Sequence, residues 1–251
     1  MRTSTQKLLL LLYSQDLNRS PRLKLTELEW LLPEVGPAGR RSLVYLLVKR
    51  GWLSLFGGYS HGWLSLTRPG QQALEAQFPA LNSFWGEWTG EWDQVVFLAP
   101  PASDKQFRYL RELLLKQRTL PVARGVYLWP SGFLPELPEL FLKLYPRSVL
   151  VFNSIRVIVG DLKPIVFDYY RLEELFQHYS SISRSIDSLI STFKTKKRLI
   201  TKERIRVLNL LEKILFCLQF DLGLAQFYLP DMPSPNRLVF KLQTLTKKLS
   251  H

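Results

Sequence analysis

Residues 36–51 read GPAGRRSLVYLLVKRG, and residues 52–67 continue directly with WLSLFGGYSHGWLSLT. In the first stretch Pro37 suits the first turn of a helix, and Gly51 suits the position after its end. In the second stretch two apolar runs flank a turn between Gly57 and Gly62, which is typical of a β-hairpin. A basic helix joined directly to a hairpin is the layout of a winged helix-turn-helix, in which the helix enters the major groove of DNA.

The predicted helix divides into two faces at about 100° per residue. We expect one face to be buried, and it carries Leu43, Leu46, Leu47 and Arg50. The opposite face is small or polar and carries Ala38, Arg41, Ser42, Tyr45 and Lys49. Polar side chains on that face can contact base edges or phosphates, and its small residues let the helix sit deep in the groove. An ordinary solvated face on an α+β domain is the alternative for this helix alone.

The helix and the turn of the hairpin supply the DNA-binding residues that we predict. On the helix, Arg41, Ser42 and Tyr45 are expected to face base edges. Lys49 on the helix, with Tyr59 and His61 in the turn, is expected to position the DNA backbone. The complete set is Arg40, Arg41, Ser42, Tyr45, Lys49, Tyr59 and His61.

Upstream of this helix, two further helices complete a predicted winged helix-turn-helix domain of residues 1–80. A leucine-rich run spans residues 4–14, and a second helix spans residues 26–32. Thr26 and Glu29 have the spacing of a capping box, and Pro33 ends the second helix. The first residues imitate a signal peptide, but their apolar run is too short and lacks a small-residue cleavage site. We therefore expect a core helix there.

Alternating strand and helix patterns follow a linker of residues 81–91. Strands are predicted at residues 94–99, 125–129, 148–153 and 155–159, and helices at residues 138–144 and from the capping Asp104 to residue 116. This order within residues 92–165 indicates a ferredoxin-like sandwich, to which we assign dimerisation. Residues 166–251 predict a helical C-terminal domain, with helices at residues 171–193, 202–220 and 237–249. The expected fold class is α+β.

The charge of the chain favours an anionic partner, since its formal net charge is +13 over 251 residues. Residues 1–80 carry ten basic and five acidic side chains, and residues 166–251 carry fourteen and eight, whereas the middle is nearly balanced. The run KTKKR at residues 194–198 is extended by Lys202, Arg204 and Arg206. Such a run is usually a solvated helix end. The alternative is a phosphate contact, either to DNA or to an anionic small molecule.

The sequence contains no pattern for catalysis, for a metal or for a membrane span. Cys217 is the only cysteine and lies in an apolar run, which predicts a buried side chain and favours a reducing cytoplasm. The histidines lack metal-ligand spacing, and no phosphate loop or nucleophile motif occurs. No apolar stretch approaches the ~20 residues of a membrane span. We therefore expect no enzyme, no catalytic residue, no cofactor and no metal.

Four tryptophans between the linker and the second predicted strand have two alternative uses. They could line an aromatic pocket, or they could pack in the core and at domain interfaces, which is the expected use at this spacing. They are Trp85, Trp88, Trp92 and Trp129.

Several segments, in their order along the chain, resemble the PaaX-type transcriptional repressors of phenylacetate catabolism. They read RSLV at 41–44, KRGWL at 49–53, LTRPG at 66–70, GEWDQVVF at 90–97, GVYLWP at 125–130 and LPDMP at 229–233. The resemblance covers nearly the whole chain at low density. It implies a homodimer that binds a partly palindromic operator in double-stranded DNA. In such families an acyl-coenzyme A thioester is the usual inducer that releases the DNA.

The resemblance also bears on individual residues. Arg41 falls where the family has an arginine in its recognition helix. Leu46 stands where the family usually has a second arginine, and Met232 replaces a usual tryptophan. The operator sequence and the phenylacetyl ligand are therefore not carried over. The expected effector stays an acyl-coenzyme A or another anionic small molecule, with no assigned binding residues.

The central sandwich also resembles the ferredoxin-like nucleases of CRISPR adaptation, which hold a metal ion with an acidic residue at the end of the first strand. Here residues 99–101 read APP at that place, and Asp104 lies beyond them in a helix-cap position. A lone aspartate does not supply the converging oxygen ligands that Mg²⁺ requires. A nuclease is therefore the least favoured function.

These observations predict a dimeric, sequence-specific DNA-binding regulator, a repressor that a small anionic effector releases from DNA. The alternative from another class is a nucleic-acid-binding adaptor or architectural protein held by its basic ends alone. Charge-driven binding of that kind discriminates little among sequences and weakens steeply as salt rises.

Overall fold

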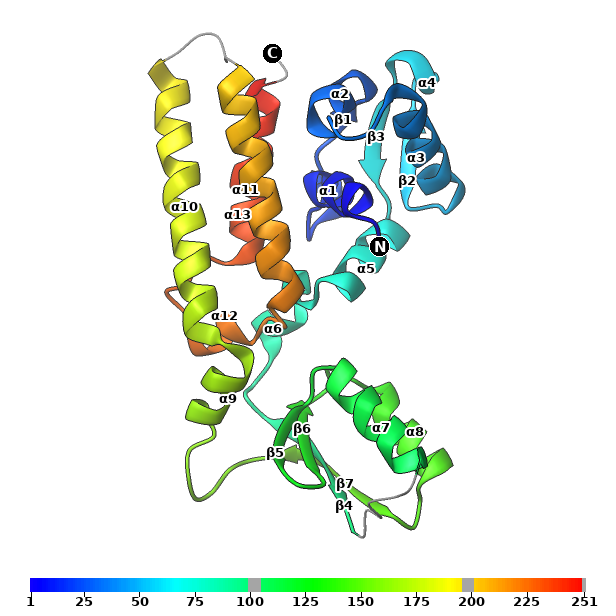
Figure 1. Cartoon of the computed structure of the whole chain (residues 1–251), viewed down its shortest axis with the longest axis vertical. Coiled ribbons are helices and arrows are strands. Elements are labelled where there is room, and N and C mark those ends of the chain that lie inside the picture. The colour runs from blue at the N-terminus through cyan, green and yellow to red at the C-terminus, as the bar shows by residue number, and fades with distance from the viewer. Residues whose placement is uncertain (99–104, 196–200, 250–251) are drawn as a thin grey trace. The chain divides into compact units, whose positions relative to one another are not determined.

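The computed structural model describes residues 1–98, 105–195 and 201–249. The fold is α+β and mostly helical, with two antiparallel sheets (Figure 1). The chain divides into two units. The terminal unit comprises residues 1–83 and 174–251, and the central unit comprises residues 84–173. Among the described helices, none combines the length and the apolar character that crossing a bilayer requires.

The N-terminal part of the terminal unit places short helices against a small sheet. Its helices are α1 (Thr3–Leu12), α2 (Leu28–Leu31), α3 (Pro37–Lys49), α4 (Gly58–His61) and α5 (Arg68–Gln77). The sheet has the strand order β1-β3-β2, with β1 (Leu23–Lys24), β2 (Leu53–Phe56) and β3 (Trp63–Leu66). The helix at residues 37–49 and the hairpin after it are confirmed.

Two details before α3 differ from the sequence-based expectation. Strand β1 was not predicted, because two residues are too few to show the alternation of a strand. The predicted capping box of Thr26 and Glu29 is wrong, since a 3₁₀ helix, η2 (Leu25–Glu27), precedes α2. The reciprocal contact lies two residues earlier, where the backbone N–H of Lys24 donates to the carboxylate of Glu27 at 3.3 Å.

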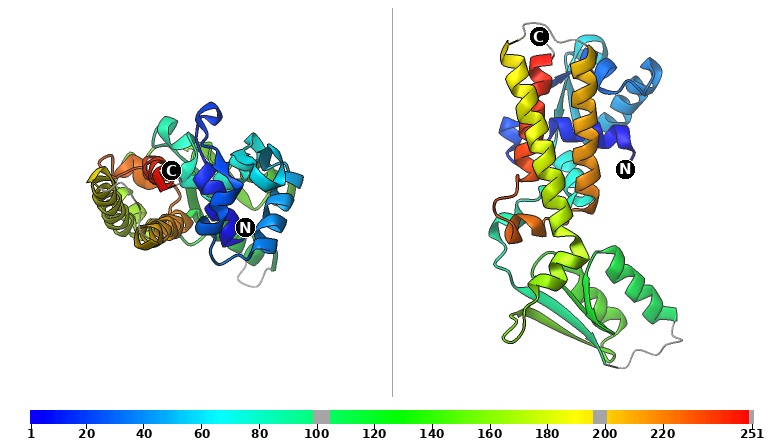
Figure 2. Two further views of the ribbon diagram at one scale, coloured as in Figure 1. Left: turned by 90° about the horizontal axis from the view of Figure 1, so that it is seen from above. Right: turned by 60° about the vertical axis from the view of Figure 1, so that its left-hand side comes forward.

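The C-terminal part of the terminal unit is a set of helices, of which α11 and α13 contact α1. The set comprises α10 (Leu172–Thr195), α11 (Thr201–Phe220), α12 (Leu224–Tyr228) and α13 (Pro235–Leu249). Both views of the ribbon show α10, α11 and α13 lying side by side (Figures 1 and 2). The predicted helices at residues 171–193, 202–220 and 237–249 are confirmed, whereas α12 was not predicted.

Helix α1 joins the two parts of the terminal unit. It contacts β3 and α5 on the one hand and α11 and α13 on the other. Its five leucines from Leu8 to Leu12 are all buried, which confirms the expected core helix. The side-chain amide of Gln243 on α13 donates to the carbonyls of Leu10 (3.1 Å) and Tyr13 (2.7 Å). The two ends of the chain thus share one core.

The central unit is a four-stranded antiparallel sheet with helices on one face. Along the chain it runs β4 (Trp92–Phe97), α7 (Lys105–Lys116), β5 (Leu120–Ala123), β6 (Val126–Pro130), α8 (Glu136–Leu144) and β7 (Val149–Ile155). The strand order across the sheet is β5-β6-β4-β7. Leu110 and Leu114 of α7 and Phe141 of α8 pack on Val95 and Trp129 of the sheet in one core.

The central unit differs from the expected pattern at its edges. Strand β5 was not predicted because Pro121 lacks a backbone N–H, and such a residue is tolerated only in an edge strand such as this one. Of the two strands expected at residues 148–153 and 155–159, the first is confirmed as β7. The second is wrong, because β7 ends at Ile155 and residues 156–159 form no strand. Two short helices were also not predicted, α6 (Phe84–Glu87) and α9 (Lys163–Tyr170). Residues 99–101 and the predicted helix cap Asp104 lie outside the described residues.

The tryptophans of the central unit pack against one another. Trp85 and Trp88 have ring centroids 5.9 Å apart, Trp88 and Trp92 have them 5.5 Å apart, and both pairs are edge-to-face. All three rings are buried, and Trp129 is fully buried in the core beneath the helices. Packing rather than an open aromatic pocket is therefore the use that the structure gives them.

Candidate nucleic-acid interface

Helix α3 carries the candidate interface, and the loops around it fix its position. Gly36 precedes it in an extended conformation, and Pro37 occupies its first turn. Val44 and Leu47 are buried against the rest of the unit, and the helix contacts β2. At its far end Gly51 adopts a φ of 69°, in the left-handed region that favours glycine, so the chain turns sharply into the hairpin.

The exposed face of α3 holds four of the seven predicted DNA-binding residues. Arg41, Ser42, Tyr45 and Lys49 are all exposed, together with Ala38. They occupy one stripe along the helix, since they are spaced by three or four residues. Helix α3 contains no acidic residue, so no carboxylate of its own reduces the positive charge of this stripe.

The buried face of α3 is rotated from the one that the sequence predicted. Leu46 is 42% exposed and Arg50 is exposed, whereas both were expected in the core. The core direction lies between Val44 and Leu47, roughly 80° around the helix from the centre of the predicted face. The expectation was wrong because it weighed the number of leucines and left Val44 out. Leu46 therefore adjoins the exposed stripe as an apolar side chain.

Arg40 lies apart from the exposed stripe, although it is next to Arg41 in sequence. Its guanidinium donates to the backbone carbonyl of Val35 at 2.7 Å and approaches that of Leu32 at 3.5 Å. These carbonyls belong to the connection between α2 and α3. The structure thus gives Arg40 a contact that positions the start of α3.

The hairpin brings one of its two predicted residues beside α3. Tyr59, on the one-turn helix α4 between the strands, is half exposed and lines a cavity of about 320 Å³ together with Arg41 and Pro37 of α3. Gly62 closes the turn tightly, because a Cβ there would lie 2.2 Å from the carbonyl oxygen of Gly58. His61 is exposed in the same turn. The structure therefore brings Arg41 and Tyr59 together at the N-terminal end of α3, where Arg40 also lines the cavity although its guanidinium donates to Val35, and it leaves Lys49 at the other end.

The outer face of the small sheet adds residues that the sequence analysis missed. Phe56 and Trp63 are opposite each other on β2 and β3, and both rings are partly exposed. The ammonium of Lys24 lies 4.9 Å from the ring centre of Trp63, and the guanidinium of Arg22 lies 5.5 Å from that of Phe56. The alternation of side chains along the hairpin could have indicated that these two rings share one face of the sheet. The two cations depend on the pairing of β1 with β3, which the sequence did not reveal.

The basic run after α10 is placed only in part. The structure leaves residues 196–198 and the side chain of Lys194 undescribed, so their predicted phosphate contact falls outside the described residues. Lys202 and Arg206 are exposed on α11. Arg204 has its guanidinium 5.5 Å from the ring centre of Trp30, in a cation–π contact with the N-terminal part of the unit.

Neither the models of protein families nor the curated proteins gave a match to the sequence. Within residues 1–98, 105–195 and 201–249, no three histidine, cysteine, aspartate or glutamate side chains are grouped so as to hold a metal ion. The candidate interface thus rests on its own residues.

Proposed function

We propose that the chain is a sequence-specific, double-stranded-DNA-binding transcriptional regulator, a dimeric repressor that a small anionic effector releases. In this proposal residues 1–80 form a winged helix-turn-helix. The observation that carries it is the exposed stripe of α3, where Arg41, Ser42, Tyr45 and Lys49 lie together without a carboxylate on the helix. Such a helix presents donors to guanine and to phosphates, and the hairpin beside it contacts the backbone.

The central unit supports the proposal through its topology. Its elements follow the order strand, helix, strand, strand, helix, strand, and its sheet has the order β5-β6-β4-β7. This arrangement agrees with a ferredoxin-like domain. We assign dimerisation to it, because a dimer matches the two half-sites of a palindromic operator. By the resemblance to PaaX-type repressors, the effector would be of the acyl-coenzyme A type.

Selection from a random duplex library with the full-length protein tests the function directly. We expect an enriched inverted repeat whose half-sites lie about one helical turn apart, and binding that persists at near-physiological salt. An enriched single half-site would retain specific binding but reject the dimer. If no motif is enriched and binding disappears as salt rises, the protein is the non-specific adaptor instead.

A further inference from the structure

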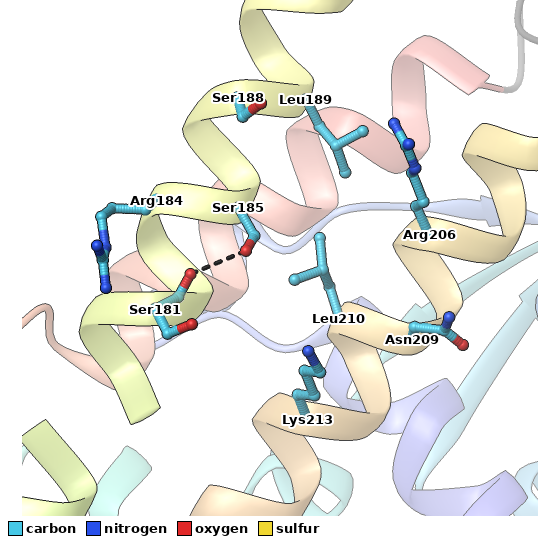
Figure 3. A pocket seen from close by; sticks show the side chains of 9 residues that line it. All are labelled: Ser181, Arg184, Ser185, Ser188, Leu189, Arg206, Asn209, Leu210 and Lys213. Carbon is cyan, nitrogen blue, oxygen red and sulfur yellow. Dashed lines mark hydrogen bonds between the residues drawn. The ribbon is translucent and has the colours of Figure 1, made fainter. Parts of the chain in front are cut away.

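The two longest helices of the terminal unit, α10 and α11, enclose a groove of about 640 Å³ (Figure 3). Its lining follows helical spacing on both sides, with Ser181, Ser185 and Ser188 on α10 and Arg206, Leu210 and Lys213 on α11. Residues spaced by three, four and seven share one helix face. The groove is therefore built from one continuous face of each helix, and its volume falls in the range of small-molecule sites.

The groove combines an apolar floor with a cationic rim. Leu189 and Leu210 point toward each other from the two helices, and Lys213 extends into the space beside them (Figure 3). Arg206 lies further along α11, and Arg184 lies on the outer side of α10. The lining contains three cations and no carboxylate.

Two carboxylates of these helices are paired with cations of other helices. Asp187 of α10 pairs with Lys241 of α13 at 2.7 Å, and Glu212 of α11 pairs with Lys7 of α1 at 2.8 Å. Across the part of the chain that the structure describes, no carboxylate lies within 4.0 Å of the charged groups of Arg184, Arg206 or Lys213. Within the described residues, Arg206 and Lys213 on the groove side of α11 thus have no ion pair, and a bound anion would relieve their mutual repulsion.

We propose that this groove binds a phosphorylated small molecule, with its apolar part on Leu189 and Leu210 and its phosphoryl groups at Arg206 and Lys213. Arginine offers a planar fork of donors and lysine a mobile point charge, and both bind phosphate oxygens well. The hydroxyls of Ser181 and Ser188 add donors at the opposite wall. A single carboxylate would leave one of the two cations Arg206 and Lys213 uncompensated, so a ligand with at least two negative charges fits better.

The position of the groove favours a small molecule over the DNA backbone. DNA-binding residues of the proposed function lie on α3, which contacts β2, whereas the groove lies on α10 and α11. Helix α1 contacts an element of each region, β3 of the first and α11 of the second. The groove would be the effector site of the proposed regulator. Only the role of the ligand as an effector rests on the proposed function, because binding of the ligand in the groove does not require DNA.

Calorimetric titration of the full-length protein with ATP tests the proposal, because ATP joins a phosphate chain to an aromatic ring whose flat faces can pack on leucine side chains. Adenosine keeps the ring without the charge, and inorganic tripolyphosphate keeps the charge without the ring. We expect ATP to bind at least about tenfold more tightly than either, and its affinity to fall as salt rises, because the cations are exposed. Equal binding of adenosine overturns the anionic site, and equal binding of tripolyphosphate overturns the role of the leucine floor.

A pair of variants locates the site. We expect the double change Arg206→Gln and Lys213→Gln to weaken ATP at least about tenfold. The control Arg237→Gln removes an exposed cation of α13 outside the lining and should change the affinity less than about twofold. Equal losses in both variants would mean diffuse charge attraction and overturn the site. In the unchanged protein, ATP should shift the amide resonances of residues 181–189 and 206–213. This measurement tests the location of the site even if the double variant fails to fold.

The titration contains no DNA, so its failure and that of the proposed function are distinguishable. Absence of ATP binding at millimolar concentration would remove the groove proposal and leave the operator selection untouched. If ATP does not bind and the double variant instead loses DNA affinity, the groove is a backbone contact for DNA. That result would also overturn the small-molecule site.

Discussion

Arg40 and Arg41 are adjacent in sequence, but their guanidinium groups serve different parts of the molecule. Arg41 is exposed on the stripe of α3, whereas Arg40 donates to the carbonyl of Val35 at 2.7 Å. We expect Arg41→Ala to cost ~1–3 kcal/mol on the preferred DNA site and much less on random DNA. We expect Arg40→Ala to lower the free energy of unfolding by about 1 kcal/mol, because a charge-assisted hydrogen bond is lost.

Fluorescence anisotropy on the selected and a scrambled duplex, with urea unfolding of both variants, separates these roles. Equal losses of Arg41→Ala on both duplexes would assign Arg41 to the DNA backbone. If Arg40→Ala left stability unchanged and reduced DNA affinity, Arg40 would belong to the interface after all.

At single positions of the interface, some features could be predicted from the sequence and others could not. The exposed stripe of α3 could be predicted, because polar and small residues recur at helical spacing from Ala38 to Lys49. The exposure of Leu46 could not, because the direction of the core depends on the partner that Val44 and Leu47 meet. The inward contact of Arg40 is of the same kind, since it depends on where the carbonyls of the preceding turn point.

The buried phenol of Tyr179 links α10 to the end of α11. Its hydroxyl donates to the Asp221 carboxylate at 3.1 Å, and both side chains are fully buried. We expect Tyr179→Phe to lower the free energy of unfolding by ~1.5–3 kcal/mol, because a hydrogen bond to a charged group is lost. Tyr45→Phe is a matched control, since that ring is largely exposed on α3. Urea denaturation of both variants measures the difference, and equal effects would contradict the assigned role of the Tyr179 hydroxyl.

The same phenol gives stability a dependence on alkaline pH. Burial raises the pKa of Tyr179 well above its usual range, and the Asp221 carboxylate raises it further. A group whose pKa rises on folding contributes its full stability below the unfolded pKa of about 10 and loses it as pH rises toward the folded pKa. We therefore expect the free energy of unfolding to fall above about pH 10, and to fall less steeply in Tyr179→Phe.

Thermal unfolding between pH 8 and 11.5 checks this slope. Some slope should remain in the variant, because the pKa values of Tyr13 and Lys7 are also raised. Burial is the main cause at Tyr13. At Lys7 burial lowers the pKa, but hydrogen bonds to Glu212 and Glu34 outweigh it. Identical slopes in the unchanged protein and in Tyr179→Phe would contradict the expectation.

At the scale of the elements, a buried side chain of α13 forms two hydrogen bonds with backbone carbonyls at the end of α1. Gln243 is buried and donates to the carbonyls of Leu10 and Tyr13 at the end of α1, where the Leu10 carbonyl also accepts from the N–H of Tyr13. Gln243→Ala would leave two acceptors without this donor, so we expect a loss of ~1–3 kcal/mol in the free energy of unfolding. Lys248→Ala, at an exposed position of the same helix, should change it by less than about 0.5 kcal/mol. Faster amide hydrogen exchange in α13 of Gln243→Ala, but not of Lys248→Ala, would support the assignment, and unchanged exchange would contradict it.

Elements with strong local patterns could be predicted, and elements defined by their partners could not. The spacing of apolar residues located α3, α7, α10 and α11, and the glycines of residues 57–62 located the hairpin. Strand β1 exists only because it pairs with β3, and β5 was hidden by Pro121. The groove between α10 and α11 could not be predicted either, because the polar residues of each helix considered alone are typical of a solvent-exposed face.

At the scale of the whole chain, the terminal unit unites sequence segments that a reading along the chain would separate. The sequence-based division into residues 1–80 and 166–251 stays a prediction, but in the structure these segments share the core around α1. Further links are hydrogen bonds from Gln226 to the carbonyl of Ala80 at 2.7 Å and from Asn236 to that of Leu81 at 3.3 Å. By contrast, the central unit has a core of its own within residues 84–173.

This asymmetry predicts how fragments behave. A fragment of residues 84–173 should fold alone, whereas residues 1–83 should not, because α1 would expose the leucine surface that α11 and α13 cover. Each buried leucine contributes ~1.5–3 kcal/mol, so exposing two or three of them removes about as much as the 5–15 kcal/mol that stabilises a typical domain. We expect dispersed amide resonances for the fragment of residues 84–173. For residues 1–83 we expect poorly dispersed amide resonances, which become dispersed when residues 174–251 are added. Cooperative thermal unfolding of residues 1–83 alone would show that the DNA-binding part is independent of the C-terminal helices, contrary to the shared core.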